Sequence, residues 1–392
     1  MQKILIICPT YGNAVEALSV HTKMMKSYFS RHFEVAIMAT ARQDDSATNM
    51  DPEPNVRLIE LAGAWNFISL ITKQPQIKEF DPDKIFIQYV PFLYGRGGIN
   101  LGFPLWVMLM RIFSRASIEI YCHELYYPFE IKLKSMVMHF SHIIMLLILG
   151  ISAHKILVTT RNFEKLMKRL LFFKKKIYWL PVGPNIEKTR VDDNACEAFR
   201  IKHSIAFTDF VLGSFGTFHP SKNYHLIFKI LMKIKTESKI PIRFIMIGQD
   251  EEQLLKYLGE DDFHQLKGTV ITTGQLDDNE VNIAFVVMDL YLGYFIDGLT
   301  TRRGSIMAAM QAGLPIISTI GHATEECFIK QPQIYLYDPD EKIFFDAVME
   351  LIMHYGYQIK KNGKTRHVVF EEMFAWEKIF QSYQQSTGIS GG

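Results

Sequence analysis

Cysteine is scarce in this sequence, and the net charge is close to zero. Four of the 392 residues are cysteine, they lie far apart, and no C-x-x-C pair occurs. A small disulfide-stapled scaffold is therefore excluded, and the N-terminus lacks the basic region and apolar run of a signal peptide. We expect a reduced, cytoplasmic protein. The net charge of +2 gives no reason to expect a nucleic-acid partner.

Several catalytic signatures are also missing. The sequence contains no H-E-x-x-H zinc motif and no G-x-S-x-G nucleophile elbow. A complete G-x-G-x-x-G fingerprint is absent as well, which disfavours a nicotinamide enzyme. We expect neither a bound metal nor an organic cofactor.

Short apolar runs alternate with helical stretches along the whole chain, which predicts α/β domains with parallel sheets. Residues 179–185 concentrate two prolines and a glycine, and we place a domain boundary after Pro184. Two tandem doubly wound domains result, with ligands expected beyond the carboxyl ends of the strands. The predicted strands cover 3–8, 33–38, 83–90, 118–122, 155–160, 210–214, 242–247, 270–272, 290–293, 316–318 and 334–337.

Charge and hydrophobicity are unevenly distributed. Residues 1–190 carry 24 Lys or Arg against 15 Asp or Glu, so that the first half is basic and the second acidic. Residues 135–153 contain no charged side chain, which favours a buried or interfacial helix over a membrane span. Residues 165–176 fit either a helix at an anionic surface or an ordinary amphipathic helix. Residues 135–176 are therefore a candidate membrane-facing region.

Two positions in the first half lie where a ligand is expected. Gly12 and Asn13 follow the first strand and precede a helix predicted from Ala14 to about Ser30, so backbone N–H groups there could face an anion. His123 follows the strand at 118–122. It suits either a hydrogen bond to a substrate or a structural bond within the chain.

The second half holds a richer set of phosphate-binding groups. Gly216 follows a strand and Lys222 comes six residues later, which suits a close approach of phosphate to the backbone and a point charge. Residues 297–305 combine an acid, two arginines, hydroxyls and a helix start, a set that favours diphosphate binding. The candidates in this run are Asp297, Gly298, Thr300, Thr301, Arg302, Arg303 and Ser305.

Together these features resemble the retaining glycosyltransferases of family 4, also described as glycosyl transferases group 1. The resemblance implies the GT-B fold, in which two Rossmann-like domains face a central cleft. It implies donor contacts from Gly12, Asn13, Gly216 and Lys222, and a catalytic sugar contact from His123. The run Thr273-Gly274-Gln275 resembles the loop that contacts the nucleotide base. Residues 374–377 resemble the start of a last helix that packs back on the first domain, which gives segments 1–184, 185–370 and 371–392.

The sequence also departs from the pattern of that family. Thr217 stands where an arginine is usual, and Ala308 stands where the second glutamate of the usual pair belongs. The chain resembles a subset with Asp-Gly-x-x-x-Arg-Arg-x-Ser, in which Asp297 takes the sugar-facing acidic role. Arg302 or Arg303 then supplies the cation missing at position 217.

The resemblance implies a metal-independent enzyme that transfers a sugar from a nucleotide-diphosphate sugar, with retention of configuration. The basic first half and the apolar region suggest a saccharide or lipid-linked acceptor in cell-envelope polysaccharide synthesis, on the inner face of the cytoplasmic membrane. One alternative is an inactive GT-B scaffold or partner subunit, suggested by Thr217 and Ala308. Another is a sugar-nucleotide epimerase, for which Glu124, Glu325 or Glu326 would have to act in elimination.

Overall fold

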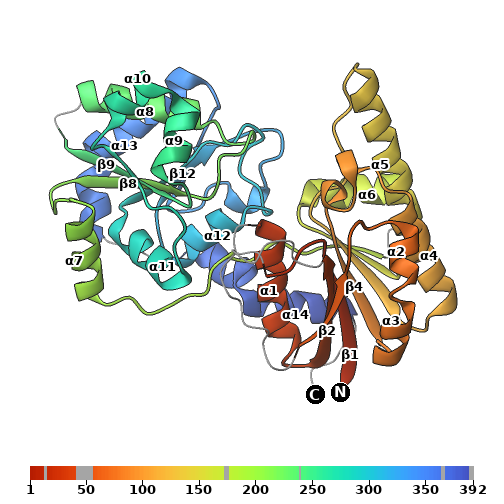
Figure 1. Ribbon diagram of the computed structural model, residues 1–392. Helices are drawn as coiled ribbons and strands as arrows, with labels where there is room; N and C mark the ends of the chain where they lie inside the picture. The colour runs from red at the N-terminus through yellow and green to blue at the C-terminus, as the bar shows by residue number, and fades with distance from the viewer. Residues whose placement is uncertain (13–15, 41–55, 172–175, 238–239, 363–366, 388–392) are drawn as a thin grey trace. The chain divides into compact units, whose positions relative to one another are not determined.

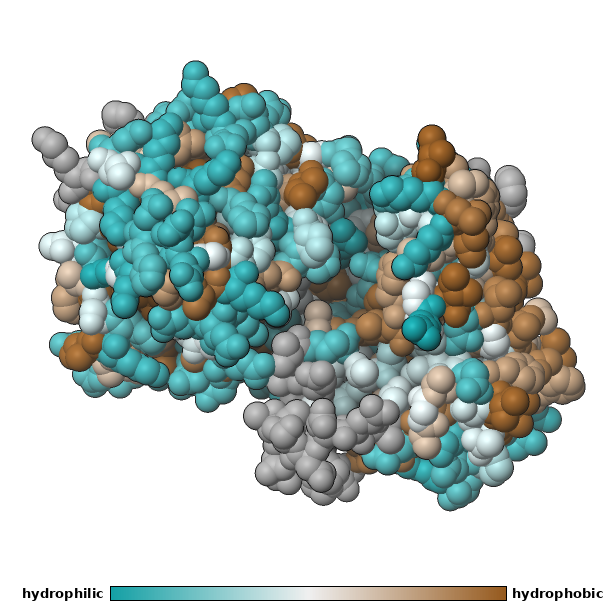
Figure 2. All heavy atoms as spheres, turned by 45° about the horizontal axis from the view of Figure 1, so that its top comes forward, coloured by the Kyte–Doolittle hydropathy of each residue, from teal (hydrophilic) through white to brown (hydrophobic). Residues whose placement is uncertain are grey.

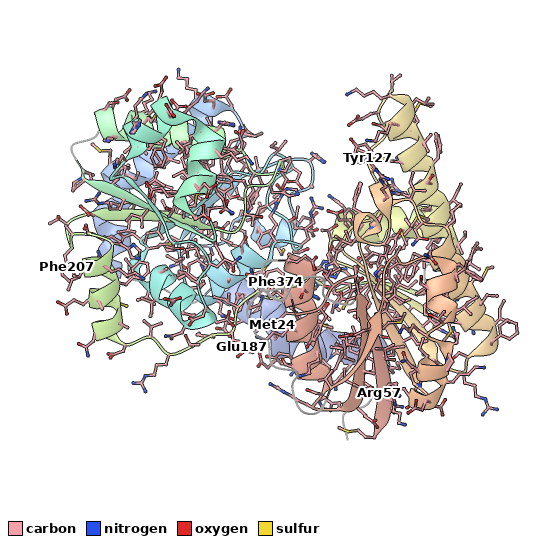
Figure 3. All side chains as sticks on the ribbon, viewed as in Figure 1. Met24, Arg57, Tyr127, Glu187, Phe207 and Phe374 are labelled. Atoms are coloured by element: carbon pink, nitrogen blue, oxygen red, sulfur yellow. The ribbon has the colours of Figure 1, made fainter. Side chains whose placement is uncertain are left out.

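The chain forms two compact units, seen in a computed structural model that describes residues 1–12, 16–40, 56–171, 176–237, 240–362 and 367–387. Unit 1 consists of Met1–Pro181 and Phe380–Gly392, and unit 2 of Val182–Ile379. The chain thus leaves unit 1 after Pro181, three residues before the predicted boundary, and returns at Phe380 rather than at residue 371. The linker stays with unit 2, because the Glu187 backbone N–H donates to Asp278 at 3.0 Å (Figure 3).

Unit 1 is built on a parallel sheet of seven strands in the order β3-β2-β1-β4-β5-β6-β7 (Figure 1). Apolar residues fill most strand positions because helices cover both faces of such a sheet. The strands are β1 Gln2–Ile7, β2 Phe33–Thr40, β3 Arg57–Leu61, β4 Lys84–Tyr89, β5 Ser117–Cys122, β6 Lys155–Val158 and β7 Ile177–Trp179. The helices are α1 Ala17–Phe29, α2 Phe67–Ile71, α3 Gln74–Phe80, α4 Gly102–Phe113, α5 Leu133–Ser152 and α6 Arg161–Leu171.

Unit 2 repeats the arrangement with six parallel strands in the order β10-β9-β8-β11-β12-β13. The strands are β8 Phe210–Phe215, β9 Ile242–Ile247, β10 Val270–Thr272, β11 Leu290–Gly293, β12 Ile316–Thr319 and β13 Ile334–Tyr337. The helices are α7 Asp193–Lys202, α8 Tyr224–Glu237, α9 Glu251–Leu258, α10 Glu260–Leu266, α11 Asp278–Val287, α12 Gly304–Gln311 and α13 Glu341–Asn362. A π-turn over Phe370–Phe374 precedes α14, which spans Trp376–Thr387 and carries the chain back to unit 1.

Both sheets have the doubly wound order that the sequence predicted. The order reverses between β1 and β4 in unit 1 and between β8 and β11 in unit 2, and ligands of such sheets bind at this reversal point. All eleven predicted strands are present, whereas the edge strands β3 and β7 were missed. Both are short, and β3 alternates exposed and buried positions because an edge strand is covered less completely.

Helix α14 is attached to unit 1 by its aromatic face. Phe380 packs against Phe29 at 5.9 Å between ring centroids, and Tyr383 packs against Phe86 at the same distance. The Tyr383 hydroxyl donates to a carboxylate oxygen of Glu119, on β5, at 2.6 Å. This buried hydrogen bond joins the last helix to the middle of the sheet.

Helix α5 is a long and strongly apolar helix. By length and composition it could cross a membrane, but 44% of its most apolar 18-residue stretch is buried inside unit 1. It packs along α4 and against the core beneath the sheet. Helix α6 has an ordinary amphipathic pattern, because Met167 and Leu171 are buried in the same core and its basic side chains lie outside.

Candidate functional site

The loops that follow β8 and β11 meet at the carboxyl edge of the unit 2 sheet. The two strands are neighbours, so the segments that leave them emerge side by side. Lys222, in the first loop, pairs with Phe295, in the second, through an isolated antiparallel bridge. The Ile296 N–H also donates to the Ser221 carbonyl at 3.0 Å. This pairing brings the predicted Gly216–Lys222 and Asp297–Ser305 groups together.

Asp297 binds both neighbouring arginines. Arg302 Nη2 lies 2.9 Å from Asp297 Oδ2, and Arg303 Nη2 pairs with Asp297 Oδ1. Each carboxylate oxygen therefore contacts one guanidinium group, and the aspartate fixes the direction of both, in the way that carboxylates commonly orient arginine. The predicted sugar-facing role of Asp297 stays a prediction.

Arg303 is the more enclosed of the two arginines, with a side chain 9% exposed against 29% for Arg302. Its guanidinium carbon stacks 3.8 Å from the Phe295 ring centroid, and Nη1 reaches Ser221 Oγ at 3.4 Å. Its Nε atom is buried and has no hydrogen-bond partner among the described residues. Burial lowers the pKa of Arg303 to about 10 despite the opposing effect of Asp297. Arg303 thus lies beside the loop that contains Lys222, and its replacement of the cation missing at Thr217 stays a prediction.

Lys222 is held against the end of β8. Its Nζ donates to the Phe215 carbonyl at 3.1 Å. Gly216 has φ +111°, and a Cβ there would lie 2.9 Å from Lys222 Nζ, so a side chain at this position would displace the lysine. Burial, and then the charge of Arg303, lower the pKa of Lys222 to about 7. Lys222 and Arg303 thus repel each other, and an anion bound beside them would reduce that repulsion.

The loop at residues 321–324 packs against Asp297 and Gly298. Gly298 has φ +92°, and a Cβ there would collide with Thr324 Oγ1 and lie 2.6 Å from the Gly321 nitrogen. The Ala323 N–H donates to the Asp297 carbonyl at 3.0 Å. The role of Gly298 is therefore close packing of two backbones.

Helix α12 begins directly after the arginines. Arg303 occupies its N-cap position, and no described side chain caps the helix with a hydrogen bond. The Ile306 N–H donates to the Arg303 carbonyl at 3.0 Å, which leaves the Gly304 and Ser305 N–H groups, with the positive end of the helix dipole, to favour an anion. Ser305 lies in this turn, and its side chain forms a hydrogen bond with the Tyr291 hydroxyl.

The two threonines of the predicted set do not face outward. Thr300 and Thr301 are 1% and 0% exposed, and the Thr301 carbonyl accepts from the Val182 N–H at 3.0 Å. Both side chains thus lie in the interior, and a contact of either hydroxyl with a ligand stays a prediction. The alternation of buried and exposed positions in an irregular loop has no period that the sequence reveals.

Three glycines lie at the ends of neighbouring strands, and the sequence predicted two of them, Gly216 and Gly274, as part of the site. Gly216 directly follows β8, Gly248 directly follows β9, and Gly274 comes two residues after β10. All three have positive φ. The Gly248 N–H donates to the Gly274 carbonyl at 3.0 Å, which joins the β9 and β10 loops. Gly248 was missed, although its place directly after a strand was a usable signal. Gln275, the predicted base-contacting residue, is exposed next to this row.

His123 lies at the carboxyl end of β5 in unit 1 and belongs to a buried polar chain. Its Nε2 lies 2.6 Å from Gln88 Oε1, and Gln88 Nε2 lies 3.3 Å from His21 Nδ1. The pKa of His123 is well below its usual value, through burial and then the nearby His21. The imidazole is neutral, and because Nε2 donates to Gln88, Nδ1 is the acceptor.

The start of α1 differs from its prediction. The helix begins at Ala17, capped by Glu16, whose carboxylate accepts from the Leu18 and Ser19 N–H groups at 3.3 and 3.1 Å. These amides are thus taken by a carboxylate of the chain itself. Gly12 is buried with φ +83°, and Asn13 lies outside the described residues, as do residues 14 and 15.

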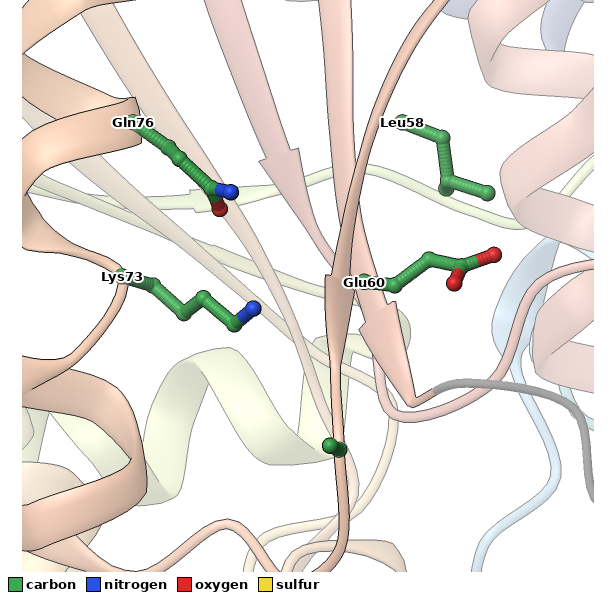
Figure 4. Close-up of a pocket in the computed structure, with 5 residues that line it drawn as sticks. Leu58, Glu60, Lys73 and Gln76 are labelled. Atoms are coloured by element: carbon green, nitrogen blue, oxygen red, sulfur yellow. The ribbon is translucent and has the colours of Figure 1, made fainter.

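A pocket of about 420 Å³ lies at the edge of the unit 1 sheet (Figure 4). Leu58 and Glu60, on β3, and Lys73 and Gln76, around α3, line it. None of these residues was predicted to be functional. Within the described ranges, no three His, Cys, Asp or Glu side chains gather as a metal-binding cluster.

The comparisons with known proteins agree with this architecture. Residues 209–354 match the family model described as "Glycosyl transferases group 1". No curated protein matches the chain. Sucrose-phosphate synthase from Thermosynechococcus elongatus has a similar structure, with a TM-score of 0.75, 14% identity and 100% of each chain covered.

Two further solved structures are similar at 14% identity, each over 99% of this chain and 100% of the other. One is Anabaena HepE in complex with UDP and glucose, at a TM-score of 0.71. The other is WaaG, described as a glycosyltransferase involved in lipopolysaccharide biosynthesis, at 0.67. The chain therefore has the predicted GT-B fold, with two Rossmann-like units. The family match over residues 209–354 lies within unit 2, and the likeness to the solved structures extends over both units.

Proposed function

We propose that this protein transfers a sugar from a nucleotide-diphosphate sugar to a saccharide or lipid-linked acceptor, with retention of configuration and without a metal ion. One observation carries the proposal. Lys222, Arg302 and Arg303 gather beside the uncapped start of α12, inside the segment that matches the glycosyltransferase family. Among the described residues, Asp297 is the acid that pairs with these arginines, so basic groups outnumber acidic ones at the site.

Such a site would act on the departing nucleoside diphosphate. Negative charge develops on the diphosphate as the bond to the sugar breaks, and fixed cations in a partly buried site stabilise that charge. Lys222 and Arg303 would take the role that a divalent cation plays in other transferases. Gly216 would let the phosphates approach the end of β8, and the first turn of α12 would add N–H donors.

Retention is proposed from the family resemblance. Asp297, with both oxygens held by arginines, is a poor nucleophile, so a retaining reaction would proceed by attack of the acceptor from the leaving-group side rather than through a covalent intermediate on this residue. His123 would contribute Nδ1 as an acceptor for a sugar hydroxyl. Because its imidazole is neutral at pH 7, it would orient the sugar rather than serve as an acid.

A similar structure and the composition of the chain suggest where in the cell the reaction takes place. WaaG, one of the similar structures, is involved in lipopolysaccharide biosynthesis. The basic first half of the chain and its scarce cysteines suit a cytoplasmic enzyme that works near anionic lipid. We therefore propose a role in cell-envelope polysaccharide synthesis on the cytoplasmic side of the membrane.

Calorimetric titration with UDP, GDP and ADP sugars tests the donor site. We expect one nucleotide to bind the unaltered chain. Arg303→Ala should weaken that binding roughly 10- to 100-fold, since a hydrogen bond to a charged group is worth about 1.5–3 kcal/mol. Arg302→Ala should have a smaller effect, because its side chain is more exposed.

Arg243→Ala is the matched control. Arg243 pairs with Asp209 at 3.1 Å with a side chain 28% exposed, but it lies near the start of β9, away from the carboxyl edge. Its loss should leave nucleotide affinity unchanged. If no nucleotide binds to the folded, unaltered chain, the proposal fails and the inactive scaffold becomes the better account.

A further inference from the structure

Helix α5 presents apolar side chains to the outside as well as to the core. The inner side packs Met145, Leu146 and Leu149 into unit 1. The outer side exposes residues spaced by three, four or seven positions, which places them on one stripe of the helix. These residues are Leu133, Val137, Phe140, Ile144 and Ile151. A helix that is apolar all round normally has both sides covered, whereas the side chains of this stripe are exposed among the described residues of unit 1.

The stripe continues onto neighbouring elements. Helix α4 packs along α5 and exposes Leu105, Ile112 and Phe113, the last at 82%. Before α5, Ile131 is 92% exposed, and Phe129 lies 6.3 Å from the Phe140 ring. We call these outward-facing residues of α4, α5 and 129–131 the α4–α5 face. Figure 2 shows hydrophobic side chains gathered on this side of unit 1. So large a contiguous apolar surface marks an interaction site.

The charges around the α4–α5 face are mostly basic; an acid in its 129–131 segment, Glu130, is partly buried and accepts hydrogen bonds from the Tyr127 and Ser135 hydroxyls. Arg111, Arg115, Lys132 and Lys134 are all exposed at the ends of the two helices. Neither α4 nor α5 contains an aspartate or glutamate. Apolar residues bordered by bases match a lipid surface that carries anionic headgroups.

The inner side of α5 shows why the helix would not cross the membrane. His142 is buried, and its Nδ1 accepts from the Tyr127 N–H at 3.0 Å. Gly98 approaches the same imidazole so closely that a Cβ on it would lie 2.9 Å from His142 Cε1. A helix bound this closely to the rest of the unit could leave it only by exposing buried polar groups to lipid.

We propose that the α4–α5 face docks unit 1 onto the surface of an anionic bilayer, with α5 in the interfacial plane. The outer stripe would insert among the lipid headgroups, while the flanking arginines and lysines would pair with phosphates. The stripe is about 30 Å long at 1.5 Å per residue. The sequence predicted residues 135–176 as the membrane-facing region. The proposed surface includes α4 in addition to α5 and excludes α6, because the apolar side of α6 packs in the core.

Co-sedimentation with vesicles tests this proposal without any nucleotide. The full chain is mixed with phosphatidylcholine vesicles that do or do not contain one quarter phosphatidylglycerol. We expect tight binding to the anionic vesicles and at least tenfold weaker binding to the neutral ones. Raising the salt concentration should weaken the anionic binding, because lipid charge is screened within a Debye length.

Paired substitutions locate the surface. Ile112→Glu with Ile144→Glu should weaken binding at least tenfold, because both side chains are exposed and a carboxylate would be repelled by anionic lipid. Ile201→Glu with Phe207→Glu, at exposed sites on unit 2, is the matched control and should have no effect (Phe207 is labelled in Figure 3). Lys132→Gln with Lys134→Gln should reduce binding roughly 30-fold, at about 1 kcal/mol per base.

Melting temperature and nucleotide affinity show that each variant is folded, and neither should change. Failure of vesicle binding leaves the donor titration unaffected, so the two proposals are tested separately. Three results would overturn the lipid proposal: no vesicle binding by the unaltered chain, equal loss in the unit 2 control, or dimers that dissociate in the Ile112→Glu and Ile144→Glu variant. The last would show that a second copy covers this surface.

Discussion

Lys222 illustrates how one residue can report on the charge state of the site. Its amino group contacts the Phe215 carbonyl and lies under the influence of Arg303, and its pKa of about 7 lies well below that of a free lysine. An anion bound between Lys222 and Arg303 would stabilise the charged form and raise this pKa. Binding and protonation are therefore linked.

The first prediction at this scale is proton uptake when a nucleotide sugar binds. At pH 7 about half of the Lys222 side chains are neutral in the free protein, so binding should take up as much as half a proton. Affinity should then fall as the pH rises above 7, since deprotonation must be reversed. Calorimetry in buffers of different ionisation enthalpy measures the uptake directly.

Lys222→Arg is the control, because arginine stays charged throughout this pH range. The variant should bind the nucleotide sugar without proton uptake and with a flatter pH profile. An equal uptake in the variant would assign the titrating group elsewhere and contradict the pKa of Lys222.

Residue identities in the site were easier to predict than the direction of their side chains. Residue type and position after β11 were enough to select Arg302, Arg303 and Asp297. The mutual pairing of these three depends on loop geometry, and so does the burial of Thr300 and Thr301. A loop has neither the twofold period of a strand nor the 3.6-residue period of a helix, so the sequence does not indicate which side chains point inward.

At the scale of elements, helix ends show the same limit. The spacing of apolar residues predicts α1, but its beginning depends on one carboxylate, Glu16, whose bonds to the Leu18 and Ser19 amides fix the first turn. Glutamate is not a usual N-cap residue, so the sequence favoured an earlier start. The consequence is functional, because the capped amides are no longer free for a ligand.

Helix α14 allows a sharper test of an element. Tyr383 donates to Glu119, which is 2% exposed and lies 3.4 Å from Lys84. Burial and the adjacent carboxylate keep the pKa of Tyr383 well above 10, so the hydroxyl remains a donor at any physiological pH. Tyr383→Phe should therefore destabilise the attachment of α14 by about 1.5–3 kcal/mol. Hydrogen exchange of the α14 amides should accelerate roughly 10- to 100-fold.

Tyr127→Phe provides the comparison for this change. Tyr127 donates to Glu130 at 3.1 Å, but both side chains are only partly buried. Its loss should cost less than about 1 kcal/mol, because water replaces the missing donor. Equal effects of the two substitutions on urea unfolding would show that burial adds nothing to the Tyr383 hydrogen bond.

For the whole molecule, the alternation of strands and helices was the strongest signal in the sequence. Continuous apolar runs such as Ile4–Ile7 lie in central strands, which are covered on both faces and therefore conspicuous. The edge strand β3, with Arg57 and Glu60, resembles a loop in composition. That a last helix returns to unit 1 was expected from the family resemblance, with the segment starting at residue 371 rather than at Phe380, since no local pattern encodes which domain a terminal helix joins.

The two units have separate sheets and separate cores, and this organisation leads to the last prediction. The described cations of the donor site all belong to unit 2. A ligand that binds only the folded form stabilises it by RT ln(1 + [L]/Kd), about 2.7 kcal/mol at 100 times Kd. A saturating nucleoside diphosphate should therefore slow exchange of the core amides of β8, β9 and β11 about 100-fold.

Core amides of β1, β4 and β5 should exchange at unchanged rates, which hydrogen exchange with mass spectrometry can follow in the same sample. Arg303→Ala removes a cation from the site and should abolish the protection of unit 2 at the same nucleotide concentration. Equal protection of both sheets would show that the units unfold as one cooperative structure. In that case each unit would depend on the other for its stability, and substitutions in the core of unit 1 would weaken nucleotide-site protection as well.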